Sequence, residues 1–199
     1  MAERGFHDVG MAEIGAAVGV SGSAIYRHFG GKAAVLVAMF DRVIDDLARE
    51  AAAVVTSDLS PTQALRALIS TQVRFVLDDR RLLQVYHNEN ANLPDDDRRR
   101  LRRKQRLYVE EWVHVLGVLR PESSDAELRT LVHAAIGAIQ SVLFFTSGLP
   151  EDQLTGLLVS VAEATTSAPP MPTVPAVSIV PAVSTVPAVS IVPAVPTAR

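Results

Sequence analysis

Polar aromatic and titratable side chains gather in two stretches of the chain whose chemistry suits a small ligand. Residues 86–90 read YHNEN, and residues 108–114 contain two aromatic residues one helical turn apart. In a helix, positions i, i+3 and i+4 share a face, so such residues can present donors and acceptors together. The candidate ligand-binding residues are Tyr86, Glu89, Asn90, Tyr108, Trp112 and His133. The alternative is ordinary helix packing with a solvated polar face, and the sequence favours neither.

The same residues offer little for catalysis or metal binding. His87, Glu89 and His133 carry suitable ligand atoms, but their spacing matches no metal-ligand motif. The chain has no cysteine, which excludes disulfides, thiol catalysis and Cys-ligated zinc. It also shows no nucleophile–base pair and no nucleotide-binding loop. We therefore expect neither an enzyme nor a bound cofactor or metal.

A basic run, RRRLRRKQR over residues 98–106, directly follows three aspartates at 95–97. Such a run can bind nucleic acid or an anionic ligand. Because arginine suits phosphate geometry, one hypothesis is that a few of these side chains hold the phosphates of an acyl-CoA-like ligand. The reading that we favour is a solvated helix face with local ion pairs.

The N-terminal fifth of the chain has the pattern of two short helices joined by a tight turn. Residues 11–18 carry apolar side chains at the spacing of one helical face. Gly19 can adopt a positive φ and end that helix, and Ser21 can cap a second helix over residues 22–29. Two short helices with a glycine-containing turn indicate a helix-turn-helix. The second helix of such a unit enters the major groove of DNA.

This stretch, from Gly5 to Leu36, resembles the DNA-binding pattern of the TetR/AcrR family of bacterial one-component regulators. The pattern stands here as Gly5-Phe6, Val9-Gly10, Ile14-Gly15, Val18-Gly19-Val20-Ser21, Ser23, Ile25-Tyr26, His28-Phe29 and Lys32. The departures from the family are Gly10 for a capping Thr, Gly15 and Val18 for Ala, and Ser23 for Gly. The rest of the chain resembles the family in its length and all-helical layout.

The resemblance implies that the second helix contacts operator DNA. The residues expected at this interface are Ser21, Gly22, Ser23, Ala24, Tyr26, Arg27, His28 and Lys32. The small residues at the helix start allow close approach to the groove, while Tyr26 and His28 are expected at phosphates. Arg27 is the candidate for a bidentate guanine contact, although it could equally face solvent. Lys32 at a helix N-terminus adds charge to N–H groups that favour a phosphate.

In the resembled family a further helix precedes the Gly-Phe pair, whereas here Met1 stands where that helix would end. That helix normally closes a small hydrophobic core that has nothing to spare. The first fifty residues also carry seven acidic side chains against five basic ones, so the basic footprint of a DNA-binding protein is absent. We therefore expect weak DNA binding by the chain as written, recoverable by an upstream helix.

The middle of the chain predicts an all-α, antiparallel helical domain without a sheet. Apolar periodicity and start and stop residues predict helices over 33–55, 61–78, 80–91, 95–119, 125–146 and 151–165. We assign residues 1–36 to the DNA-binding unit and residues 37–167 to ligand binding and dimerisation. The resemblance implies that the helices bearing Tyr86 and Tyr108 surround a cavity for a small apolar or amphipathic effector.

From Ala168 the chain changes character. Prolines recur every six residues within hexads such as PAVSIV, at Pro175, Pro181, Pro187 and Pro193. Proline at this density forbids a helix and weakens a strand, so residues 168–199 predict a flexible, partly polyproline-like tail. A left-handed β-helix is the lesser alternative, because the hexads lack glycine turns and are too few to bury a core.

The charge and hydropathy of the whole chain set further limits. The formal net charge is −3, so the molecule has no bulk attraction for nucleic acid. No signal peptide or bilayer-spanning apolar run occurs. We expect a cytoplasmic protein without membrane contact.

Together these patterns predict a ligand-responsive transcriptional repressor that binds operator DNA as a homodimer and is released by a small molecule. Dimerisation is expected through the last two helices. Their apolar stripes are Leu131, Ala134, Ala135, Ala138, Val142 and Phe145 on the first helix, and Leu154, Leu157, Leu158 and Val161 on the second. The alternative is an all-helical dimer that no longer reads DNA because its first helix is missing, and that binds a ligand or a partner instead.

Overall fold

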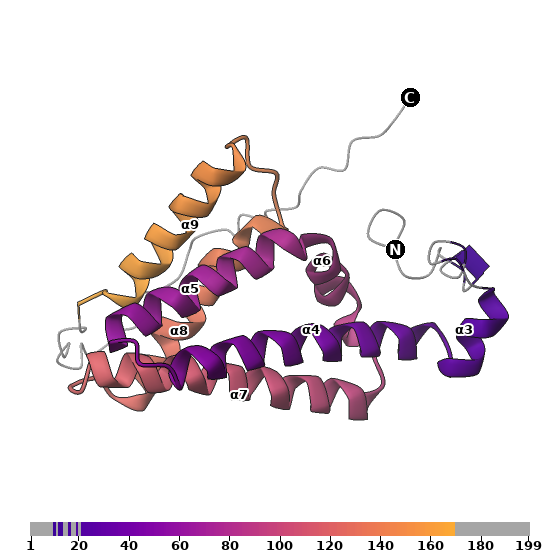
Figure 1. The fold of residues 1–199 in the computed structure, drawn as a ribbon, viewed down its shortest axis with the longest axis horizontal. Helices are drawn as coiled ribbons and strands as arrows, with labels where there is room; N and C mark the ends of the chain where they lie inside the picture. Colours follow the sequence, from indigo (N-terminus) through magenta and orange to yellow (C-terminus); the bar gives the residue numbers. More distant parts are fainter. Residues whose placement is uncertain (1–9, 11, 14–15, 17–18, 20, 170–199) are drawn as a thin grey trace, which may run out of the picture. The chain divides into compact units, whose positions relative to one another are not determined.

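The computed structural model describes residues 10, 12–13, 16, 19 and 21–169. Most residues of the helix predicted over 11–18 lie outside this described part. Met1, on which the expectation of a missing helix rests, and the predicted tail beyond Pro169 lie outside it as well. The helices are α3 (Gly22–His28), α4 (Lys32–Val55), α5 (Pro61–Asp78), α6 (Arg80–Glu89), α7 (Asp95–Leu119), α8 (Asp125–Gln140) and α9 (Glu151–Thr166), with 3-10 turns η1 (Asn90–Asn92) and η2 (Ser141–Leu143) (Figure 1). The described residues contain no strand, which confirms the all-α prediction.

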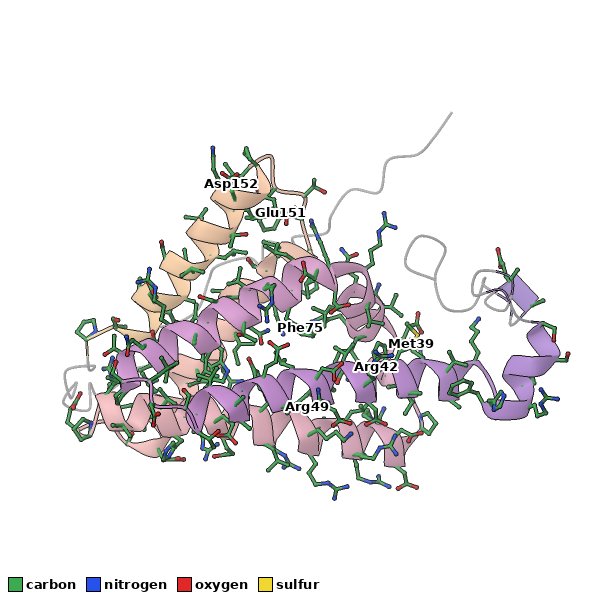
Figure 2. The ribbon with its side chains drawn as sticks, in the orientation of Figure 1. Met39, Arg42, Arg49, Phe75, Glu151 and Asp152 are labelled. Carbon is green, nitrogen blue, oxygen red and sulfur yellow. The ribbon has the colours of Figure 1, made fainter. Side chains whose placement is uncertain are left out.

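Local sequence signals start several of these helices where they were predicted. At α5, Ser60 Oγ accepts from Gln63 N at 3.4 Å, and Gln63 Oε1 accepts from Ser60 N at 3.0 Å. This reciprocal capping box, with Pro61 in the first turn, satisfies backbone groups that the helix itself cannot pair. Ser124 and Glu127 form the same box at α8. The acidic residues Glu151 and Asp152 occupy the first turn of α9 (Figure 2), where the helix dipole favours negative charge.

The end of α8 differs from its prediction. The helix was expected to reach Thr146 but ends at Gln140 and tightens into η2. Side chains of α6 take up carbonyls at this end: Gln84 Nε2 donates to Leu143 O at 2.7 Å, and Arg80 donates to Phe145 O. Tertiary contacts therefore end the helix before its sequence pattern does.

Two hydrophobic clusters hold the helical body together. The larger joins α5, α7, α8 and α9 around the fully buried Trp112 and also includes Leu68, Ile69, Leu116, Val132 and Ile139. The smaller binds the first half of α4 to α6 and α7, through Leu36, Val37, Phe40, Ile44, Val85, Leu93 and Leu101. As a result α4 and α7 run side by side, and α8 packs on α9 (Figure 1).

The helical body extends to Ala168. Arg120 Nη1 donates to the carbonyls of Thr166 at 3.0 Å and Ala168 at 2.6 Å, which ties the end of α9 to the end of α7. The compact unit accordingly ends at Ala168. Within the part of the chain that the structure describes, no helix is long and apolar enough to cross a membrane.

Candidate functional site

The short helix α3 follows a glycine turn of the predicted kind. Gly19 has a φ of 74°, which confirms the positive φ expected at this turn. Ser21 Oγ and Ser23 Oγ lie 3.0 Å apart across the start of α3. A second glycine, Gly31, has a φ of 150° and separates α3 from α4. Residues with a side chain rarely adopt such φ values, so both positions favour glycine.

The predicted DNA-binding residues differ in how far they reach solvent. The side chains of Ser21, Ser23, Tyr26, Arg27 and His28 are exposed, and that of Tyr26 is 59% accessible. Lys32 is half-buried as the first residue of α4. Gly22 and Ala24 belong to α3, but their solvent exposure lies outside what the structure describes. Arg27 and His28 fall in the last turn of α3 rather than its first.

A cavity of about 410 Å³ lies within the helical body. Its apolar lining consists of Phe40, Val43, Ile44, Leu47, Phe75, Leu82, Leu83, Val109 and Ile136. Its polar lining consists of Gln72, Tyr86, His87, Asn90, Arg102, Gln105, Tyr108, His133 and Gln140. Phe75 belongs to this wall from α5, the helix that packs against α4 (Figure 2). A cavity of this size that combines apolar side chains with polar groups is typical of a small-molecule site.

Four of the six predicted ligand-binding residues line the cavity, and two do not. Tyr86, Asn90, Tyr108 and His133 line the cavity, whereas Glu89 and Trp112 are absent from its wall. Glu89 is buried beside η1, where Asn92 Nδ2 donates to its Oε2 at 3.0 Å.

Trp112 packs edge-on against Tyr108, with 6.2 Å between ring centroids, inside the larger hydrophobic cluster. Trp112 therefore contacts the cavity-lining Tyr108 without lining the cavity itself.

Hydrogen bonds organise the two tyrosines of the cavity differently. Tyr108 Oη donates to Gln72 Oε1 at 2.7 Å, and burial raises the pKa of Tyr108 far above its usual value. Gln105 Nε2 donates to Tyr86 Oη at 3.0 Å. Burial also raises the pKa of Tyr86, partly offset by the Gln105 hydrogen bond and the charge of Arg102. Both hydroxyls therefore stay protonated near neutral pH.

A histidine at the cavity wall is biased toward its neutral form. His87 packs edge-on against Tyr86 and Phe144, at ring-centroid distances of 6.2 and 5.3 Å. Partial burial lowers the pKa of His87, because desolvation penalises the charged imidazolium. At neutral pH this residue therefore contributes hydrogen-bonding capacity without positive charge.

Sequence reasoning did not single out Gln72, Arg102 or Gln105 as ligand-binding residues. Gln72 carried a usable signal, because it lies on the otherwise apolar face of the helix from Pro61, and the structure buries it almost completely. Arg102 was one member of a basic run, and nothing local distinguished it from its neighbours.

The basic run of α7 is largely neutralised by aspartates. Within the helix, Arg98, Arg99 and Arg100 pair with Asp95, Asp96 and Asp97 respectively. This arrangement supports the solvated face with local ion pairs for these three residues.

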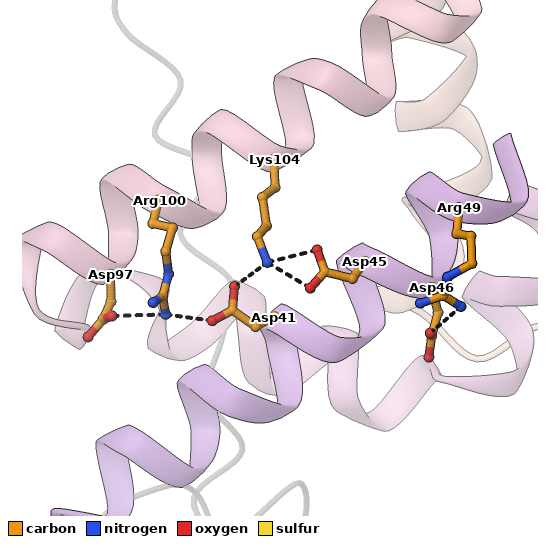
Figure 3. A network of polar contacts seen from close by, with 7 residues as sticks. All are labelled: Asp41, Asp45, Asp46, Arg49, Asp97, Arg100 and Lys104. Carbon is orange, nitrogen blue, oxygen red and sulfur yellow. Dashed lines mark hydrogen bonds and ion pairs between the residues drawn. The ribbon is translucent and has the colours of Figure 1, made fainter. Parts of the chain in front are cut away.

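Two members of the run also reach across to α4 (Figure 3). Arg100 pairs with Asp41, while Lys104 Nζ lies 2.9 Å from Asp41 Oδ1 and 2.7 Å from Asp45 Oδ1. Burial lowers the pKa of Lys104, but its hydrogen bonds to Asp45 and Asp41 outweigh that effect and raise it. Because that raised pKa belongs to a lysine, the stabilisation is present below about pH 10.4 and is lost above it. The ion pairs thus fasten α4 to α7 at physiological pH.

Two family models match the sequence. The model described as bacterial regulatory proteins of the tetR family matches residues 1–39. The model described as a tetracyclin repressor-like C-terminal domain matches residues 58–143. Together the matches span more than half of the chain, and they cover both α3 and most of the cavity-lining helices.

The fold is similar to solved structures of regulators. PfmR from Thermus thermophilus superposes with a TM-score of 0.69 at 15% identity, covering 83% of this chain and 91% of that one. AibR in complex with isovaleryl coenzyme A and operator DNA gives a TM-score of 0.65 at 18% identity, with coverages of 80% and 90%. The ketosteroid transcriptional regulator of Mycobacterium tuberculosis gives a TM-score of 0.66 at 18% identity, with coverages of 81% and 86%.

No curated protein matches the sequence at a significant level. The two family models, over residues 1–39 and 58–143, and the fold shared with solved regulators nevertheless indicate the same family. The chain therefore belongs to the TetR family of bacterial regulatory proteins, and it is a DNA-binding transcriptional regulator rather than an enzyme.

Proposed function

We propose that this regulator represses transcription by binding operator DNA as a homodimer, and that a small apolar or amphipathic effector releases it. The observation that carries the proposal is the position of α4. This helix begins directly after Gly31, at the end of the DNA-binding unit. Farther along, its residues Phe40, Val43, Ile44 and Leu47 form one wall of the cavity. One rigid element therefore belongs to both sites.

Release would follow from a shift of α4. Operator half-sites lie about 34–36 Å apart, so both reading helices of a dimer must match that spacing together. An effector that presses on Phe40 or Leu47 favours a different position of α4 and misplaces α3 in each subunit. The effector shifts this equilibrium only as far as it prefers the released conformation. The AibR complex, which holds both isovaleryl coenzyme A and operator DNA, shows that a protein of this fold can bind a small molecule and an operator.

The operator is found by selecting bound fragments from genomic DNA with the purified full-length protein. Specific binding should exceed binding to a scrambled duplex by at least about 10³-fold at physiological salt. Fluorescence anisotropy with both duplexes measures that ratio. A ratio near one would argue against the repressor and would favour the non-DNA-binding dimer instead. No observation on the described residues otherwise favours the non-DNA-binding dimer. A repressor of transcription would act in the cytoplasm.

The proposed dimer interface is narrower than the predicted apolar stripes. Ala135, Val142, Leu154 and Leu158 are buried inside the subunit, so they hold α8 and α9 to the body. Of the predicted stripe residues, Ala134, Phe145, Leu157 and Val161 are exposed. Gly137 on α8 and Gly156 on α9 are exposed as well. Small side chains beside exposed apolar ones allow two helices from each subunit to pack closely about a two-fold axis.

Leu157→Glu should convert a dimer into a monomer at micromolar concentration. The Leu157 side chain is 49% exposed, and a carboxylate facing its two-fold mate would be desolvated without a partner. Sedimentation velocity measures the change. Leu107→Glu is the matched control, because Leu107 is 62% exposed and lies on α7 rather than on α8 or α9. A wild-type protein that sediments as a monomer would contradict the proposed interface.

A further inference from the structure

We infer that the effector of this regulator is a monoanion, an apolar molecule with one carboxylate that Arg102 and Tyr86 bind at the cavity wall. The inference rests on the proposed function only in taking the cavity as the effector site. The chemical class of the ligand and its two binding residues, Arg102 and Tyr86, go beyond that proposed function.

The charge of the cavity lining comes from a single side chain. Among the described residues of the wall, Arg102 is the only arginine, and no Lys, Asp or Glu lines the cavity. Its neighbours Arg98, Arg99, Arg100 and Lys104 pair with aspartates, and Arg103 and Arg106 do not line the cavity. In the described part of the chain, no carboxylate lies within ion-pair distance of Arg102. A guanidinium left without an anion on an apolar wall suits a carboxylate, which it can bind in a bidentate manner.

Tyr86 supplies a second donor for the same anion. Its oxygen already accepts the hydrogen bond from Gln105, so its own O–H proton remains to be donated. No acceptor for that proton occurs among the residues that the structure describes. Arg102 and Gln105 are three residues apart on α7 and thus share a face, and the charge of Arg102 acts on Tyr86. The hydroxyl of Tyr86 and the guanidinium of Arg102 therefore belong to the same cavity wall, and we expect one carboxylate to contact both.

Part of the remaining wall suits an apolar body, beside the polar side chains of His87, Asn90, His133 and Gln140. Tyr108 and Gln72 satisfy each other at 2.7 Å and thus offer little to a polar ligand. Ile44, Leu83 and Ile136 belong to the same lining. Arg102 itself is exposed, so the carboxylate would remain partly hydrated, and the cost of burying a charge is avoided.

A cationic effector fits the structure less well. Acidic side chains do occur nearby, but they line a separate hollow of about 190 Å³ between α4 and α5, which contains Asp46, Glu50, Asp78 and Asp79. This hollow shares Val43, Leu47 and Phe75 with the main cavity, but none of its acids. A cation inside the main cavity would lie near Arg102 and would find no carboxylate in the wall.

A ligand with several phosphates also fits less well. Arg98, Arg99, Arg100 and Lys104 are committed to Asp41, Asp45 and the aspartates at 95–97, and Arg103 and Arg106 do not line the cavity. The cavity of about 410 Å³ lies near the lower end of the usual range for small-molecule sites, about 300–1,000 Å³. We therefore assign the anion to a free carboxylate rather than to a coenzyme A thioester.

Decanoate is the probe, and Trp112 is the reporter. Trp112 is the only tryptophan in the chain and packs against Tyr108 of the cavity wall. The full-length protein is titrated with decanoate, decan-1-ol, decylammonium and decanoyl coenzyme A while Trp112 fluorescence is followed. Decanoate should bind most tightly. Arg102→Gln should weaken decanoate binding at least about tenfold and leave decan-1-ol unchanged within about twofold.

Arg103→Gln is the matched control. Arg103 is an exposed neighbour on α7 that does not line the cavity, and its substitution removes the same charge, so decanoate binding should change less than about twofold. Tyr86→Phe, which removes only the hydroxyl, should weaken decanoate binding about threefold to tenfold. Circular dichroism shows that each variant is folded.

Several results would overturn the inference. They are tighter binding of decylammonium or decanoyl coenzyme A than of decanoate, equal losses for Arg102→Gln and Arg103→Gln, or no decanoate binding at all. Operator release, measured by anisotropy in the same solutions, separates this failure from that of the proposed function. Release by decan-1-ol or decylammonium but not by decanoate would retain the repressor and reject the anionic effector. Absence of operator binding would reject the repressor whatever decanoate does.

Discussion

Trp112→Ala should lower the free energy of unfolding by about 3–5 kcal/mol, which is the usual range for truncating a buried Trp or Phe. Trp112 is fully buried in the larger hydrophobic cluster and contacts Tyr108 edge-on. Removing its ring leaves a void among α5, α7 and α8, which the surrounding helices can fill only in part. Urea unfolding followed by far-ultraviolet circular dichroism measures the loss.

Two further variants separate cavity formation from other effects at this position. Leu107→Ala changes a 62% exposed residue on the same helix and should cost within about 0.5 kcal/mol. Trp112→Phe keeps an aromatic ring and removes an indole N–H that finds no acceptor in the described part of the structure. Its cost should therefore be well below that of alanine. Equal losses for Trp112→Ala and Leu107→Ala would contradict the assignment of Trp112 to the core.

Arg27→Ala should weaken binding to the selected operator by about 1–3 kcal/mol, or roughly tenfold to hundredfold, if Arg27 holds a guanine. The exposed Arg27 guanidinium extends from the last turn of α3. From there the arginine side chain must extend along the groove to contact a base edge. Tyr26→Ala should instead weaken binding to operator and scrambled DNA alike, as expected of a phosphate contact. Fluorescence anisotropy with both duplexes at several salt concentrations separates these outcomes.

Arg106→Ala is the control for the operator experiment, because it removes one exposed positive charge from α7. Its affinity for either duplex should remain within about twofold of the wild type. If Arg27→Ala weakened operator and scrambled DNA equally, Arg27 would be a phosphate contact and sequence reading would lie elsewhere on α3.

The capped helix starts of this protein were predictable because they depend on interactions over three or four residues. Ser60 with Gln63, and Ser124 with Glu127, satisfy helix N-termini from within their own segments. Gly19 adopts its positive φ because the turn requires it locally. The pairs between Arg98 to Arg100 and the aspartates three residues earlier were likewise foreseeable from their spacing.

The candidate ligand site was only partly predictable, for a different physical reason. Periodicity shows which residues share a helix face, but not where packed helices leave a void. Tyr86 and Asn90 line the cavity while Glu89, between them in sequence, does not. Trp112, one turn from Tyr108, fills the core behind it. Whether an apolar face contacts another helix or a ligand depends on the packing of all helices together.

Sequence by itself thus determined the all-α fold, the glycine turn, the helix starts and the family. Tertiary structure decided where α8 ends, because Gln84 and Arg80 of α6 bind carbonyls beyond it. It also decided the charge of the cavity. Arg100 and Lys104 find partners on α4 about sixty residues earlier, whereas Arg102 does not. Local hydrogen bonds are encoded within a helical turn, but such distant pairs exist only once α4 and α7 have packed together.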